Sequence, residues 1–397
     1  MSGRRSDNPW KIYDDVQELY ENRRKELQRT VAERRAEEKK WAEENPVLAQ
    51  RLYDYIAGKL PELDWSQITF KQNIATRTAS ASVLGYLAEH VHNMIVSSAD
   101  LANSDKTDGF LKKTRALCAE DFSGAFLQAG VAELTMACIM NGIALHGGLI
   151  GACGTFFVFS DYMKPAIRMS ALMQLPVKYI YTHDAFRVGE DGPTHQPVEH
   201  EAQARLLEQM NNFSEKMAAL VLRPADSMET AACYKLAMEN NESPTILIFS
   251  RQDLKDIPGE NLDNIIKGCA KGAYIVRKEE NPEITLLANG SEVSLLCEVA
   301  AMLSTEGIRI QVVSIPSVGL FARQDKQYRN SVIPAGSKVF ALTAGLPAVF
   351  AQIATQYEME IFGLERFGAS APYKVLDEKF GFTAQNIADR VKHFLRN

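Results

Sequence analysis

Residues 122–160 read FSGAFLQAGVAELTMACIMNGIALHGGLIGACGTFFVFS, and Glu133 is the only ionised side chain among them. Burying a carboxylate in so much apolar sequence without a partner costs several kcal/mol. A carboxylate placed in this way is suited to handling a proton for a ligand. The stretch also allows a second reading, in which Glu133 lines the start of a helix and points into water.

The apolar run from 134 to 160 is long enough to suggest a membrane helix. Polar residues and glycines interrupt it, however, so we expect a buried helix over about 130–145, then a turn and a buried strand near 154–159. The interrupting residues are Asn141, His146, Gly142, Gly147, Gly148, Gly151 and Gly154.

On both sides of this stretch, helical patterns alternate with short apolar runs, which predicts a parallel sheet with helices on both faces. Three of the runs end in polar loops: NMIVSSADLANSD (93–105), PVKYIYTHD (176–184) and PTILIFSRQDL (244–254). Ligands of such sheets bind beyond the carboxyl ends of the strands. We therefore expect these loops to meet at one edge of the sheet.

A second alternating region follows the charged segment 254–268. The fold class is therefore α/β: two consecutive three-layer α/β/α domains with mainly parallel sheets, at 69–258 and 259–397. A charged helical linker, 1–68, precedes them, with its helices broken near Asn45–Pro46. The turn Asn289–Glu292 could hold a phosphate at a helix amino terminus, but a structural turn is the simpler interpretation.

The composition is that of an ordinary globular protein, with 397 residues, 46% hydrophobic, 24% charged and a net charge of -6. The mildly acidic balance gives no reason to expect nucleic acid or an anionic membrane as a partner. The six cysteines have no CxxC spacing and read as reduced core residues, and the polar amino terminus lacks the apolar core of a signal peptide. These features predict a cytoplasmic protein.

Proton-handling groups follow the strand at 176–184. His183 ends that strand, and the loop GEDGPTHQ (189–196) carries Asp191 and His195. Histidine titrates near neutral pH, so two histidines beside a carboxylate could relay protons or bind phosphate and hydroxyl groups. Either histidine alone would read as a surface residue. Their predicted convergence at one edge favours a site.

Cations and aromatic rings are also predicted near this edge. Arg77 and Arg251 stand beside small or apolar residues and could hold a phosphate through paired hydrogen bonds, with Ser104 adding a hydroxyl. Most aromatic clusters belong to a core. Next to a lone carboxylate, however, rings could stack on a flat heterocycle while Glu133 bonds one of its nitrogens. The rings concerned are Phe156, Phe159 and Tyr162.

These segments resemble the transketolase family over nearly the whole chain. GVAELTMACIMNGIALHGG, GTFFVFSDYMKPAIRMSALM, SADLANSD, YTHDAFRVGEDGPTHQPVEH and FSRQDL resemble its pyrimidine-binding domain. ANGSEVSLLCEVAAMLSTEGIRIQVVSIPS, FARQDKQYRNSVIP and ERFGASAP resemble its carboxy-terminal domain. The resemblance implies a thiamine-diphosphate-dependent transferase of the pentose phosphate pathway, which moves a two-carbon ketol unit between sugar phosphates.

The resemblance also implies a role for each residue. Glu133 would hydrogen-bond the aminopyrimidine ring of the cofactor and promote its reactive tautomer, with the rings of Phe156, Phe159 and Tyr162 around the pyrimidine. His183 and His195 would contact sugar hydroxyls and handle protons. The remaining matches concern the substrate. Asp191 would bind a substrate hydroxyl, and Asp100 lies on the loop that carries Ser104. The sugar phosphate would be held by Arg77, Ser104, Arg251 and His183.

One part of the family pattern is missing. A transketolase subunit also holds the cofactor diphosphate through Mg²⁺ or Ca²⁺ in a preceding domain marked by Gly-Asp-Gly, which occurs nowhere here. We therefore expect no metal ligand on this chain and a separate N-terminal subunit, with two copies of each in a heterotetramer. The alternatives are a non-catalytic binding or regulatory protein, or a related thiamine enzyme such as dihydroxyacetone synthase or deoxyxylulose phosphate synthase.

Overall fold

The structure is a computed structural model that describes residues 8–259 and 261–397, and these residues form two compact units divided after Lys59. The first unit contains helices α1 (Asp14–Glu44) and α2 (Pro46–Ile56). Proline suits the first turn of a helix, where its missing N–H is not needed, so the predicted break at Asn45–Pro46 is confirmed. The amino-terminal segment predicted to lack a signal peptide includes residues 1–7, which lie outside the described ranges.

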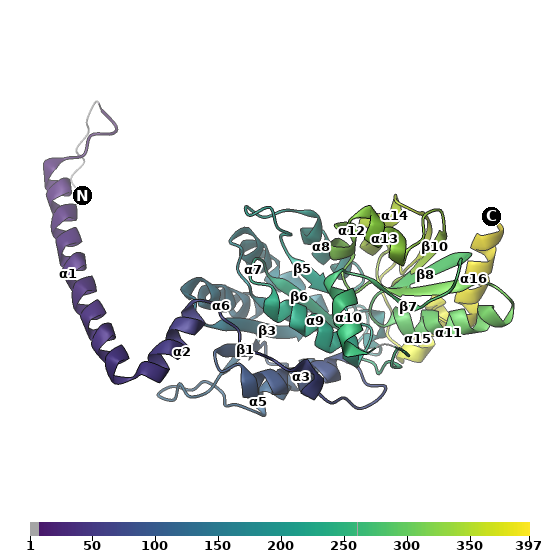
Figure 1. Ribbon diagram of the computed structural model, residues 1–397, viewed down its shortest axis with the longest axis horizontal. Helices are drawn as coiled ribbons and strands as arrows, with labels where there is room; N and C mark the ends of the chain where they lie inside the picture. The colour runs from purple at the N-terminus through teal and green to yellow at the C-terminus, as the bar shows by residue number, and fades with distance from the viewer. Residues whose placement is uncertain (1–7, 260) are drawn as a thin grey trace. The chain divides into compact units, whose positions relative to one another are not determined.

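The second unit contains two sheets (Figure 1). The first has six parallel strands in the order β2-β1-β3-β4-β6-β5. Helices α3, α5 and α9 pack on one face and α6 and α7 on the other. The strands are β1 (Met94–Ser98), β2 (Phe126–Gln128), β3 (Ile150–Phe156), β4 (Lys178–Thr182), β5 (Leu220–Leu222) and β6 (Thr245–Phe249). The helices are η1 (Trp65–Gln67), α3 (Thr76–His90), α4 (Ala102–Asp105), α5 (Asp108–Leu111), α6 (Glu133–His146), η2 (Phe157–Phe159), α7 (Ser160–Leu172), η3 (Phe186–Val188), α8 (His200–Arg205), η4 (Leu207–Gln209) and α9 (Ser227–Glu239).

The second sheet has five strands in the order β11-β10-β8-β9-β7, all parallel except the edge strand β7. Helices α11, α15 and α16 cover one face, and α12, α13 and α14 the other. The two α/β/α domains are therefore confirmed, whereas their exact boundaries stay predictions. The strands are β7 (Tyr274–Arg277), β8 (Ile284–Ala288), β9 (Ile310–Ser314), β10 (Lys338–Leu342) and β11 (Glu358–Phe362). The helices are α10 (Leu262–Ala270), α11 (Glu292–Thr305), α12 (Val318–Ala322), α13 (Lys326–Val332), η5 (Pro347–Phe350), α14 (Ala351–Ala354), α15 (Tyr373–Phe380) and α16 (Ala384–Arg396).

The stretch 122–160 differs in detail from its prediction. The strand near 154–159 is β3, which starts earlier and ends at Phe156, and the next three residues form η2. Gly154 looks like an interruption in the sequence but is required by packing, since a Cβ there would lie 2.6 Å from Cγ2 of Thr107. Strand β2 was not predicted, because three residues are too few to show an alternating pattern.

Within the described ranges, no helix combines the length and the apolar character needed to cross a membrane. The residues that suggested such a helix divide mainly among α6, β3 and η2. The prediction that the cysteines are core residues holds only in part. Cys118 and Cys138 are exposed and Cys297 is half-buried, whereas the other three are buried and all six are free.

Candidate active site

The candidate site lies at the carboxyl edge of the first sheet. Strands β1, β3, β4 and β6 are neighbours and run parallel, so the segments that follow them meet at one edge, as predicted. The unpredicted strand β2 extends this edge. It runs parallel to β1, and the Ala129 N–H donates to the Ser98 carbonyl at 3.3 Å. The chain therefore enters α6 from the same edge of the sheet, and Glu133 is the first residue of that helix.

Glu133 is buried, with 9% of its surface exposed. Its carboxylate has no hydrogen-bond or ion-pair partner within the described part of the chain, and no side chain caps α6. The positive end of the helix dipole stabilises a carboxylate at this position. As the second reading expected, Glu133 starts a helix, although most of its surface is buried. Its contact with a cofactor stays a prediction.

Arg77 is placed by a pair of side-chain hydrogen bonds between α3 and the end of β6. The Thr76 N–H donates to Oγ of Ser250 at 3.0 Å, and the Ser250 N–H donates to Oγ1 of Thr76 at 2.7 Å. Nη1 of Arg77 then donates to the Ser104 carbonyl at 2.9 Å and lies 3.3 Å from Nε2 of His183. Its Nε is buried and, among the described residues, has no acceptor.

Two cations meet at this point. The pKa of Arg77 is lowered by burial and then by the positive charge of Arg251. Arg251 is exposed, while Arg77 is half-buried. The two guanidinium groups repel each other, and one of them has an unused donor. An anion with several oxygen acceptors could bind both. The arrangement therefore suits a phosphate group.

His183 is buried and has a left-handed backbone, with φ at 63°. Burial lowers its pKa to about 2, with further contributions from Arg77, Arg251 and His195. The ring is therefore neutral at pH 7. Arginine can only donate, so Nε2 accepts from Arg77, and the ring proton lies on Nδ1, which donates to Oγ1 of Thr182 at 2.8 Å.

This neutral histidine predicts a pH dependence of stability. The folded-state pKa of about 2 lies below the ordinary value near 6.5, so the unfolded chain takes up the proton first as pH falls. The His183 contribution is present above about pH 6.5 and falls by about 1.4 kcal/mol per pH unit below it. His183→Asn, which tolerates the left-handed backbone, should remove about 2 kcal/mol of the loss between pH 6.5 and 5. Urea unfolding at both pH values measures this difference, and equal pH slopes for both proteins would contradict it.

A row of aromatic rings connects the two histidines. The ring centroids of Phe156 and His183 are 3.6 Å apart, and Phe159 lies 5.9 Å from Phe156 with nearly parallel planes. Phe159 also lies 5.6 Å from His195, edge to face, and 6.1 Å from Tyr162. Tyr162 is 61% exposed and Phe159 is half-buried, so part of this aromatic surface is open to a ligand.

The structure joins only some of the predicted residues. Hydrogen bonds, ring contacts and electrostatic interactions link Arg77, Ser104, Phe156, Phe159, Tyr162, His183, His195 and Arg251. Asp100 and Asp191 are exposed at the same edge, and within 8–259 and 261–397 no hydrogen bond or ion pair joins them to this group. Their predicted roles, like that of Glu133, stay untested.

Sequence reasoning missed the residues that hold the site in place. Asp105 is buried and accepts from Oγ of Ser98 at 2.6 Å and Oγ1 of Thr107 at 2.7 Å, which fixes the short helix α4 that contains Ser104. Oγ1 of Thr194 lies 2.9 Å from Nδ1 of His195. A polar residue directly beside a predicted site residue is the signal that could have identified both.

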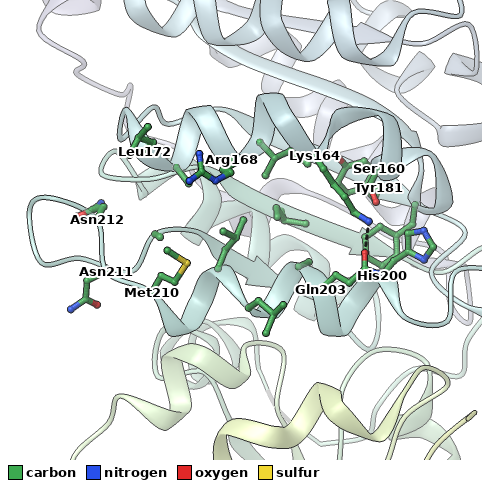
Figure 2. A pocket seen from close by; sticks show the side chains of 18 of the residues that line it. Ser160, Lys164, Arg168, Leu172, Tyr181, His200, Gln203, Met210, Asn211 and Asn212 are labelled. Atoms are coloured by element: carbon green, nitrogen blue, oxygen red, sulfur yellow. Dashed lines mark hydrogen bonds between the residues drawn. The ribbon is translucent and has the colours of Figure 1, made fainter.

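A separate cavity of about 570 Å³ lies between α7 and the segment from α8 to Ala218. Figure 2 shows Lys164 beside Gln203 and His200, and Nζ of Lys164 donates to Oε1 of Gln203. Most of the lining is apolar. None of the predicted site residues, all of which are described, lines this cavity.

The fold and this edge define a class: a doubly wound α/β protein whose parallel sheet carries cationic, histidine and aromatic groups at its carboxyl edge. Residues 72–256 match the family model of the transketolase pyrimidine-binding domain, and residues 272–383 match that of the transketolase-like C-terminal domain. The chain belongs to the transketolase family and corresponds to its carboxy-terminal half.

Relatives and solved structures agree with this assignment. The chain is 43% identical to a transketolase of Bacillus subtilis over 89% of its own length and 52% of the relative. It superimposes on a transketolase from Pichia stipitis in complex with sedoheptulose 7-phosphate with a TM-score of 0.86 and 32% identity, covering 98% of this chain and 56% of the other. A split-gene transketolase, described as an inactive beta4 tetramer, shares the fold at 24% identity and a TM-score of 0.63. The match covers 82% of this chain and 99% of the other. The chain thus spans about half the length of the full transketolases.

Proposed function

We propose that this chain supplies the pyrimidine-binding half of a thiamine-diphosphate-dependent transketolase, and that a separate N-terminal subunit supplies the diphosphate-binding half. The complex transfers a two-carbon ketol unit from a ketose phosphate to an aldose phosphate. The observation that carries the proposal is the pair of Arg77 and Arg251 beside neutral His183. The Pichia stipitis transketolase, which binds the ketose phosphate sedoheptulose 7-phosphate, supports this substrate class.

The side chains fit the aminopyrimidine end of the cofactor. The Glu133 carboxylate has no partner in the described residues, and the Phe159 ring is half-buried. Thiamine diphosphate, when bound, supplies the nucleophilic carbon that accepts the two-carbon unit. Glu133 holds a proton at a ring nitrogen of the pyrimidine. The rings of Phe156, Phe159 and Tyr162 orient the heterocycle and exclude water from it.

The remaining groups act on the sugar. Arg77 and Arg251 bind the phosphate, and Ser104 contributes its hydroxyl. Because a phosphate competes for the Arg77 guanidinium, Nε2 of His183 becomes available to accept a hydrogen bond from a sugar hydroxyl. His195 moves a proton at a second hydroxyl, and Asp100 and Asp191 accept hydrogen bonds from others.

The partner completes the site. In the described ranges, no group of three or more His, Cys, Asp or Glu side chains is arranged to hold a metal ion. We assign the ligands of the diphosphate-bound Mg²⁺ or Ca²⁺ to the N-terminal subunit, within a cytoplasmic heterotetramer of two copies of each chain. The missing Gly-Asp-Gly segment supports this assignment.

Reconstitution tests the proposal directly. With the matching N-terminal subunit, thiamine diphosphate and Mg²⁺, the chain should convert xylulose 5-phosphate and ribose 5-phosphate, and omission of any component should abolish turnover. Calorimetry on the chain alone should show weak or no binding of thiamine diphosphate, because half of the contacts are absent. Absence of turnover in the complete mixture, or tight binding by the chain alone, would contradict the proposal.

A further inference from the structure

The loops that carry His183 and His195 are packed against the second sheet. Ala185, Phe186 and Val198 lie in its hydrophobic core, although they belong to the loops of the first sheet. The Phe186 ring lies 5.3 Å from Phe380 and 4.9 Å from Phe382, measured between centroids. The two histidine loops are therefore held by the C-terminal domain as well as by their own strands.

A buried charge cluster makes the most direct connection. Asp184, next to His183 in the chain, accepts from Nε and Nη2 of Arg223 at 3.1 and 2.5 Å. Nη1 of the same arginine donates to Oε2 of Glu292 at 2.7 Å. Glu292 is fully buried at the first position of α11, in the second sheet's domain. A chain of two ion pairs thus runs from that helix to the residue beside His183.

Glu292 also fixes a second arginine in the histidine loops. Nη1 of Arg187 donates to Oε1 of Glu292 at 2.5 Å, and its Nε donates to Oδ1 of Asp377 at 2.7 Å. Oγ of Ser291 donates to Oε1 of Glu292 at 2.7 Å. Burial opposes ionisation of Glu292, but Arg223 and Arg187 outweigh it and lower its pKa. The carboxylate is therefore charged and serves both arginines.

The backbone around the cluster leaves little room for adjustment. Gly290 has a left-handed backbone, with φ at 57°, and a Cβ there would lie 2.6 Å from Nε of Arg223. On the other loop, Nε2 of Gln196 donates to the Gly189 carbonyl at 2.8 Å and to the Ala369 carbonyl at 2.9 Å. The C-terminal domain therefore contacts both ends of the segment that carries the two histidines.

We propose that Glu292 is a positioning residue for His183, acting through Arg223 and Asp184, and that holding the two histidine loops is the contribution of the C-terminal domain to catalysis. The inference rests on the proposed function. His183 has a left-handed backbone and is followed directly by Asp184. A displacement of Asp184 therefore changes the direction of the His183 side chain and moves the imidazole away from Arg77. A misplacement of about 1 Å can cost on the order of 100-fold in rate.

The test compares two isosteric substitutions of fully buried glutamates. Glu292→Gln removes the charge shared by Arg187 and Arg223. Glu229→Gln is the control, because Glu229 accepts from the Tyr274 hydroxyl at 2.7 Å and contacts none of the cluster residues named above. Burial raises the pKa of Glu229 to about 7, so neutral Gln is a close substitute. Both variants are assayed in the complex with the N-terminal subunit and cofactor.

We expect Glu292→Gln to lower kcat/KM for the sugar phosphate by about 10- to 100-fold. Glu229→Gln should stay within about 2-fold of the wild type, and Glu292→Asp, which keeps the charge, should recover part of the loss. The ¹⁵N imidazole signals of His183, assigned with His183→Asn, should shift in the isolated chain with Glu292→Gln and stay unchanged with Glu229→Gln. Ser291→Ala, which removes one hydroxyl from the cluster, provides a milder variant if Glu292→Gln does not fold.

Equal activities of the two glutamate variants, together with unchanged His183 signals, would overturn the inference and leave only a structural role for the cluster. If the two variants lost equal thermal stability and had equal kcat/KM values, the inference would likewise be overturned. Failure of the proposed function gives a different result, because the wild-type complex itself would then show no turnover.

Discussion

Replacement of Glu133 by Gln should lower the turnover of the reconstituted complex by a factor on the order of 10² to 10⁴, the usual contribution of a positioned acid or base. Glutamine keeps the shape of the side chain but cannot take up or release the proton at the pyrimidine ring. The carboxylate has no partner in the described chain, so the substitution leaves no buried charge unpaired. Stopped-flow or coupled assays with xylulose 5-phosphate and ribose 5-phosphate measure the effect.

The stability of this variant provides the control. The Glu133 carboxylate has no hydrogen-bond or ion-pair partner in the described residues, so the substitution removes only its favourable interaction with the α6 dipole. The free energy of unfolding should therefore fall by at most about 1 kcal/mol. Glu229→Gln, at a fully buried carboxylate outside the candidate site, should retain its activity. If Glu133→Gln were as active as the wild type, the chain would be a non-catalytic binding or regulatory subunit instead.

The second large effect is expected for Arg77→Ala. Charged hydrogen bonds contribute about 1.5–3 kcal/mol each, so kcat/KM for a phosphorylated sugar should fall by roughly 10- to 100-fold. Most of the change should be in KM, because the phosphate is bound equally in the ground and transition states. A sugar without phosphate should be affected much less. The ratio of kcat/KM for the two sugars is therefore the measurement.

Two further variants sharpen this result. Arg77→Lys keeps the charge but loses the planar set of donors, so it should recover only part of the activity. Arg309→Ala removes an arginine whose side chain is 55% exposed and pairs with Glu283 at 3.4 Å, and it should change neither parameter. Equal losses on phosphorylated and non-phosphorylated sugars would exclude phosphate binding as the role of Arg77.

Both predictions concern one edge of the sheet, where groups with different charge states act side by side. His183 is neutral because burial and two arginines oppose its protonation, while the buried Nε of Arg77 has no acceptor within the described residues. Under the proposed function, a sugar phosphate supplies the missing acceptor. Its binding would change what the arginines contact and thereby which hydrogen bond His183 can accept.

The sequence by itself determined the fold class and grouped several residues of the candidate site. Apolar runs that alternate with helical patterns require a parallel sheet, and the polar residues at their ends require a common edge. This reasoning placed His183, Arg251 and Ser104 at one edge of the sheet. The lone carboxylate of Glu133 marked the helix that enters from the same edge.

Only the tertiary structure decided how these groups are supported. Strand β2 is too short to be read from a pattern, yet it brings the chain to the edge where α6 starts. Asp184, Arg223 and Glu292 look like ordinary charged residues in the sequence, but they are buried and paired across the two sheets. The desolvation of these three charges is offset by partners from elsewhere in the chain, and sequence spacing does not reveal those partners.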